Sequence, residues 1–175
     1  MKRNPAFYLF IILLFNSCFS IKPATTKTGK NLWEEFFVSP GVIQYFVKPL
    51  SFQNNNDLFL FDFTFRNRSD SVTVNFTMEN PKSITSPDQI YFLTNNDSVR
   101  ISSIQTLLNE KSNDKFKLRK TGKISFVEFK QMMTQDKWVV SLTIDSANKM
   151  YYPTNKTTRH LQVLKRNLGY EIQVR

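Results

Sequence analysis

Two runs of the sequence predict its fold most clearly: residues 58–65 (LFLFDFTF) and 71–78 (SVTVNFTM). The polar residues 66–70 (RNRSD) separate them. In each run every second residue is apolar, as in a β-strand that buries one of its two faces. Polar, turn-forming residues between two such runs are typical of a β-hairpin. The sequence therefore predicts an antiparallel hairpin with these buried side chains: Phe59, Phe61, Phe63, Phe65, Val72, Val74, Phe76 and Met78.

Similar runs on both sides of this hairpin predict more strands, and their spacing favours an antiparallel β-sandwich or barrel. These further strands are residues 42–50, 89–93, 99–104, 115–119, 124–129, 138–144 and 170–174. Apolar residues at helical spacing, or a capping Thr with a later Gly, predict short helices. The candidate helices are residues 30–37, 103–109 and 157–167. We therefore expect one mostly β domain over residues 32–175, with one to three short helices.

The first residues have the composition of an export signal. Lys2 and Arg3 precede ten uninterrupted apolar residues, 6–15. A membrane-spanning helix needs about 20 apolar residues, so this run is too short to cross a bilayer. A charged start followed by a short apolar run is the pattern of a cleaved signal peptide.

The only cysteine of the chain, Cys18, ends the segment Leu14-Phe15-Asn16-Ser17-Cys18 directly after the apolar run. This segment resembles the lipobox of bacterial lipoproteins. The resemblance implies that residues 1–17 are removed as a lipoprotein signal peptide, and that Cys18 is acylated on its sulfur and on its new amino group. Two or three acyl chains hold a protein on a membrane stably, whereas one does not. Residues 18–31 are polar and are expected to form a flexible tether.

Two other interpretations of the amino-terminal segment are open. An ordinary secretory signal cut after Ser20 would leave a secreted, non-lipidated adhesin that binds an anionic partner. A secreted glycoprotein is compatible with four N-x-Ser/Thr triplets. These triplets begin at Asn67, Asn75, Asn96 and Asn155.

The composition lacks the residues on which most enzyme chemistry depends. One Cys and one His leave no internal disulfide and no Cys or His cluster for a metal. Four glycines are too few for phosphate-cradling loops or nucleophile elbows. We therefore expect that the protein binds no cofactor and no metal and has no enzymatic activity. A glycan hydrolase that uses a carboxylate pair is the third interpretation, with Glu34, Glu35 and Asp62 as candidates. Asp62 is more simply expected to be exposed or salt-bridged.

Positive charge is concentrated in the second half of the chain. Residues 18–110 contain eight Lys and Arg against nine Asp and Glu, whereas residues 111–175 contain fourteen against five, a net charge of +9. The candidate anion-binding patch consists of Lys115, Lys117, Arg119, Lys120 and Lys123. Alternating cations on one strand also protect an unpaired sheet edge from aggregation, which is the competing interpretation.

Taken together, the sequence predicts a non-enzymatic binding or assembly module of the cell envelope. It is exported and anchored through Cys18 to the outer membrane or cell surface. An envelope protein or an anionic polymer is the expected partner. Nucleic acid is not expected, because export removes the chain from the cytosol.

Overall fold

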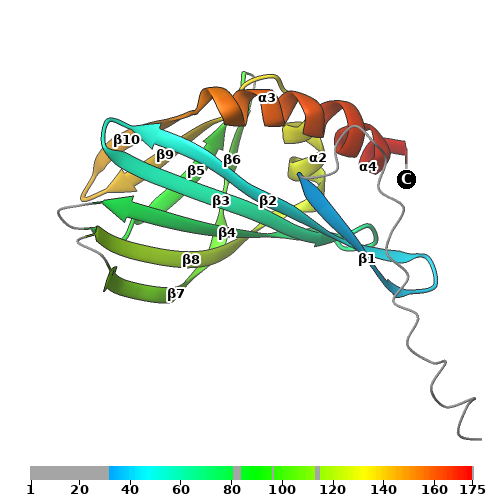
Figure 1. The fold of residues 1–175 in the computed structure, drawn as a ribbon, viewed down its shortest axis with the longest axis horizontal. Helices are drawn as coiled ribbons and strands as arrows, with labels where there is room; N and C mark the ends of the chain where they lie inside the picture. Colours follow the sequence, from blue (N-terminus) through cyan, green and yellow to red (C-terminus); the bar gives the residue numbers. More distant parts are fainter. Residues whose placement is uncertain (1–31, 81–83, 96, 113–114, 175) are drawn as a thin grey trace, which may run out of the picture.

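The computed structural model describes residues 32–174, except residues 81–83, 96 and 113–114. The predicted signal peptide, the tether and Cys18 lie outside these residues. Figure 1 shows an antiparallel, nearly closed, barrel-like sheet, so the predicted mostly β fold class is confirmed. The strands are β1 (Trp33–Ser39), β2 (Val42–Asn54), β3 (Asp57–Arg66), β4 (Ser71–Asn80), β5 (Gln89–Leu93), β6 (Ser98–Arg100), β7 (Ser102–Ser112), β8 (Lys115–Ser125), β9 (Val139–Ile144) and β10 (Ala147–Pro153).

The sheet consists of two groups of strands that are joined narrowly. The first group is β1, β2, β3, β4, β8 and β7, and the second is β6, β5, β9 and β10. The order is β6-β5-β9-β10-β2-β3-β4-β8-β7, and β1 pairs with β2 beside this path. The ladder between β10 and β2 contains two residue pairs, Tyr152↔Gln53 and Pro153↔Phe52. At the other joint, Ile101 is the single residue between β6 and β7, the two edge strands of the path. The chain itself, rather than a ladder, links these edges.

The predicted hairpin is confirmed as β3 and β4, in the register Phe61↔Phe76 and Phe63↔Val74. All eight predicted inward side chains are buried. Their rings pack against aromatic side chains of the second group of strands and of the helices. The ring centroids of Phe61 and Phe92 lie 4.7 Å apart, and those of Phe63 and Phe129 lie 5.0 Å apart. The core is therefore an aromatic cluster between the two groups of strands.

Helices α2 (Phe126–Thr134), α3 (Asn155–Leu164) and α4 (Tyr170–Val174) complete the fold, with a π-helical turn (Lys165–Gly169) between the last two. In Figure 1, α3 and α4 lie together along one side of the sheet. The predicted helix 157–167 is confirmed in α3. No helix within the described ranges combines the length and apolar composition needed to cross a membrane.

Two predicted helices are wrong, because both segments are strands. In the predicted helix 30–37, residues 33–37 lie in β1 and pair with β2, and residues 30 and 31 lie outside the described residues. Residues 103–109 lie in β7, which pairs with β8. The helical spacing of Ile104, Leu107 and Leu108 is misleading, because the two leucines are exposed while Ile104 packs against the core. In both segments, backbone pairing with a neighbouring strand outweighs the local pattern.

Two predicted strands are partly or wholly helical. The strand predicted at residues 124–129 ends at Ser125, because α2 begins at Phe126. Ser125 accepts a hydrogen bond from the N–H of Glu128, and the Glu128 carboxylate accepts one from the N–H of Ser125, which is a capping box. Residues 170–174 form α4, which continues the preceding helical segment. The strand predicted at 99–104 is also divided at Ile101 into β6 and β7.

Candidate functional site

A polar pocket of about 150 Å³ lies where the β2–β3 turn meets the end of β4 and the start of β10. Asp57, Asn80, Lys149 and Tyr151 form its polar side. Its apolar lining comes from Leu58, Met78, Ile84 and Ile144. Glu79 and Thr85 also line the pocket, which thus combines two carboxylate residues and one amine with an apolar wall.

The β2–β3 turn positions Asp57 at this pocket. Asn55 has a φ of 51°, a left-handed backbone conformation that Asn adopts more readily than most residues. The turn reverses the chain so that Asn54 pairs with Asp57. The Asn54 side-chain amide then donates a 2.7 Å hydrogen bond to the carbonyl of Met150, which holds the turn against β10.

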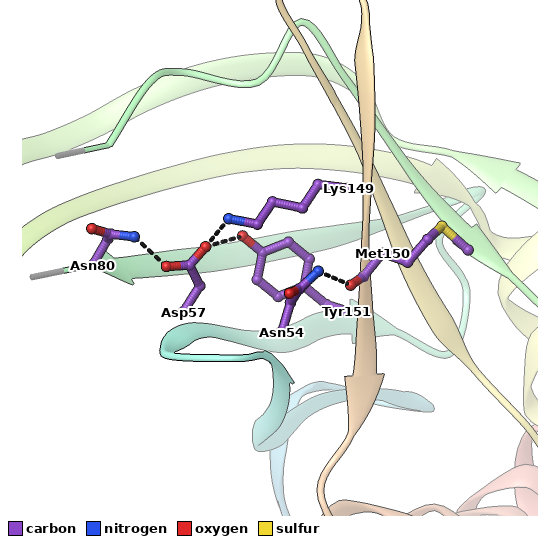
Figure 2. A network of polar contacts seen from close by, with 6 residues as sticks. All are labelled: Asn54, Asp57, Asn80, Lys149, Met150 and Tyr151. Atoms are coloured by element: carbon purple, nitrogen blue, oxygen red, sulfur yellow. Dashed lines mark hydrogen bonds and ion pairs between the residues drawn. The ribbon is translucent and has the colours of Figure 1, made fainter. Parts of the chain in front are cut away.

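Three side chains donate to the Asp57 carboxylate, as Figure 2 shows. The Asn80 amide donates to Oδ1, and the Lys149 ammonium forms an ion pair with Oδ2. The Tyr151 hydroxyl lies 3.4 Å from the same Oδ2. The Asp57 side chain is only 13% exposed, so these donors replace most of its lost hydration. The network joins β3, β4 and β10.

The electrostatics of this network favour a structural role over acid–base chemistry. Burial raises the pKa of Tyr151 to about 12, so its phenol stays protonated and donates a hydrogen bond. The Lys149 ammonium lies 5.6 Å from the centroid of the Tyr151 ring, within range of a cation–π interaction. The amine therefore interacts with both the carboxylate and the ring. The three donors engage both oxygens of the Asp57 carboxylate, whereas a general base must present its oxygen to a substrate.

The predicted anion-binding patch does not lie on one face. Lys115, Lys117, Arg119 and Lys123 alternate along β8 on the face away from the core. Lys120 belongs to the opposite, inward face, is 7% exposed and donates to the hydroxyl of Ser86. Burial lowers the pKa of Lys120. Lys120 therefore does not belong to the outward surface.

Ion pairs compensate two of the outward cations. The Lys117 ammonium lies 4.0 Å from the carboxylate of Glu79 on β4. The Arg119 guanidinium lies 3.5 Å from the carboxylate of Asp62 on β3. The structure thus brings these cations together with carboxylates, which reduces the net charge of the predicted patch.

The edge-protection interpretation of the same residues is wrong. β8 lies between β4 and β7 and is paired on both sides. Its N–H and C=O groups are engaged in two ladders, so no free edge exists there to protect. The alternation of cations instead reflects the outward face of an interior strand.

Each of the candidate carboxylates is engaged by a polar partner. Asp62 is salt-bridged to Arg119, as expected, and also accepts a 2.8 Å hydrogen bond from the Asn75 amide. Glu34 lies 3.5 Å from the ammonium of Lys48, and Glu35 accepts a hydrogen bond from the indole N–H of Trp33. Within the part of the chain that the structure describes, no group of three or more His, Cys, Asp or Glu residues could hold a metal ion.

The Asp57 network could not be recognised from local sequence. Asp57 and Lys149 are 92 positions apart, and they meet because β10 docks on β2 through a two-pair ladder and the hydrogen bond from Asn54 to Met150. The Asn-rich segment at residues 54–57 indicates a turn, but it does not indicate which side chains contact Asp57. Comparison of the chain with protein-family models, curated proteins and solved structures gave no match.

Proposed function

We propose that this protein is a cell-envelope lipoprotein whose β domain is a non-enzymatic binding or assembly module. The observation that carries this proposal is the position of Cys18, the only cysteine, directly after a short apolar run with a basic start. Acylation there would hold the exported chain on the outer membrane or cell surface. The described β domain begins 14 residues after Cys18.

The polar contacts of the domain support a module without catalytic activity. Asp57 accepts from three donors, and Asp62 is paired with Arg119 and bonded to Asn75. Carboxylates engaged in this way stabilise a fold but cannot readily take up a substrate proton. The ion pairs of Lys117 and Arg119, together with the burial of Lys120, lower the positive charge that the surface offers to an anionic polymer. An envelope protein is therefore the partner that we favour.

Labelling with a palmitate analogue in a bacterial host tests the anchor. We expect the full-length chain to incorporate the label and to sediment with membranes. Cys18→Ser should abolish both the label and the processing, because acylation of the sulfur precedes cleavage in the lipoprotein pathway that the lipobox implies.

Ser20→Tyr is the matched control. A bulky residue there blocks ordinary secretory cleavage after position 20 but leaves the lipobox-like segment intact. The anchor proposal expects this variant to behave like the wild type. A mature chain that begins at Ile21, or a label that persists in Cys18→Ser, would contradict the proposal.

A further inference from the structure

The turn between β1 and β2 exposes a cluster of apolar side chains. Phe36, Phe37 and Val38 are 50%, 72% and 47% exposed, and Pro40 and Gly41 follow them as exposed residues. We call residues 36–41 the β1–β2 tip. Figure 1 shows that this hairpin projects beyond the rest of the domain at one end. Large exposed apolar clusters are uncommon on monomers and indicate an interaction surface.

Both faces of the β1–β2 tip are apolar. Phe37 pairs with Ile43 and lies on the face that, further along the hairpin, carries the buried Tyr45. Phe36 lies on the opposite face, where its ring packs edge-on against Phe46 at 5.3 Å. Tilting the hairpin toward the domain could therefore cover one face only. A surface that surrounds the tip, such as the outer layer of a bilayer, covers both.

Cations lie next to this apolar tip. The β3–β4 turn packs against it, because the Asn67 amide donates a 3.2 Å hydrogen bond to the carbonyl of Gly41. Arg66, the last residue of β3, and Arg68 in the turn are exposed, and the Arg68 guanidinium lies directly over Gly41. Aromatic and aliphatic side chains enter the boundary between headgroups and acyl chains, while nearby arginines attract anionic headgroups.

A further exposed apolar residue lies at the same end of the domain. The N–H of Phe126, the first residue of α2, donates a 2.8 Å hydrogen bond to the carbonyl of Asp70 beside the β3–β4 turn. The next residue, Val127, is 68% exposed. Asp70 is the acidic residue of this turn, so the two arginines leave it with a positive balance.

The chain that precedes β1 is long enough for the tip to reach the membrane that would hold Cys18. Cys18 and the thirteen residues after it, 19–31, precede the first described residue. Fully extended, they span up to about 50 Å. The seven residues of β1, Trp33–Ser39, cover about 23 Å at the usual rise per residue of a strand. The tip and the anchored cysteine can therefore contact one bilayer.

We propose that the β1–β2 tip inserts into the surface of the bilayer that holds Cys18. The shared bilayer rests on the anchor proposed above, whereas the affinity of the tip for lipid does not. Tip insertion gives the domain a fixed orientation. The Asp57 pocket lies at the other end of β2 and β3, so it would face away from the membrane toward a partner.

Vesicle sedimentation with the chain from residue 18 onward, produced without its signal and therefore without lipid, tests the tip directly. We expect binding to vesicles of phosphatidylethanolamine and phosphatidylglycerol. Phe36→Ser with Phe37→Ser should lower the partition coefficient roughly tenfold or more, because two large apolar side chains lose their contact with lipid. Arg66→Gln with Arg68→Gln should weaken binding to these vesicles but not to neutral phosphatidylcholine vesicles.

Leu107→Ser with Leu108→Ser is the matched control, because it also removes two exposed apolar side chains, from β7. This variant should bind vesicles like the wild type, and melting curves should show that all variants are folded. In addition, Phe37→Trp should show a blue-shifted emission when vesicles are added.

Three outcomes would overturn the proposal. In the first, the unlipidated wild type fails to bind vesicles. In the second, the tip variant and the β7 control variant lose vesicle binding to the same extent. In the third, the tip variant keeps vesicle binding and loses only its association with an envelope protein or with a second copy of the chain. Palmitate labelling of the full chain is read out separately. If the label is absent while vesicle binding depends on the tip, the anchor proposal fails and lipid binding by the tip stands.

Discussion

Phe61→Ala removes the ring at the centre of the aromatic core. Phe61 is 1% exposed. Five rings surround it, at centroid distances of 4.7 to 6.4 Å. They belong to Phe52, Phe59, Phe63, Phe92 and Trp138. These neighbours come from β2, β3, β5 and the segment before β9, so no single shift can fill the space left by the ring.

The structure places the expected destabilisation in the upper part of the usual range. Phe→Ala substitutions in cores cost about 3–5 kcal/mol, and the cost rises with the cavity that remains. Each lost aromatic pair contributes about 0.5–1.5 kcal/mol beyond the area buried, without strict additivity. We therefore expect a loss of about 4–5 kcal/mol, a large share of the total stability of an ordinary domain.

Urea denaturation followed by circular dichroism measures this loss. Phe37→Ala is the matched control, because it makes the same chemical change at a ring that is 72% exposed. It should change the free energy of unfolding by less than about 0.5 kcal/mol. The inward register of β3 would be refuted if Phe61→Ala cost less than about 1 kcal/mol, or if both variants lost the same stability.

Three further substitutions and one control, Lys123→Met, test the polar contacts. Asp57→Ala leaves three donors without their carboxylate and should cost about 1–3 kcal/mol in urea denaturation, with the lower part of this range favoured because Lys149 is partly exposed. Burial raises the pKa of Tyr151 from 10.0 to about 12, so the unfolded chain loses this proton first as pH rises. Stability should fall between these two pH values, and melting curves of Tyr151→Phe should lack that part of the fall. Lys120→Met should leave the melting temperature at neutral pH unchanged or raise it, since burial disfavours the charged amine. Lys123→Met, on the outward face of β8, should have little effect.

Period-two alternation predicted the β3–β4 hairpin because both strands bury the large apolar side chains of one face; on the opposite face only Thr77 is buried. The same rule also placed Lys115, Lys117 and Arg119 on a common face of β8. Whether a strand is an edge or an interior strand depends on its neighbours, however, and β7 was predicted as a helix. The position of β8 could therefore not be derived from its own sequence.

The missed start of α2 has a local explanation. Ser125 and Glu128 have the spacing of a capping box, which predicts a helix start. The β-branched and aromatic residues around them favoured a strand instead. The polar pocket has no comparable signal. Asp57, Lys149 and Tyr151 meet only after β10 has docked on β2, so their proximity is a product of the tertiary fold.

The narrow joints between the two groups of strands affect how the molecule should respond to cold and pressure. One backbone joint is a ladder of two residue pairs, whereas ring contacts such as that of Phe61 with Phe92 cross between the groups. Hydrophobic contacts weaken on cooling, and high pressure favours states in which water fills the spaces between packed side chains. Backbone ladders within each group share less of this dependence. Low temperature or high pressure should therefore separate the two groups of strands before either loses its own hydrogen bonds.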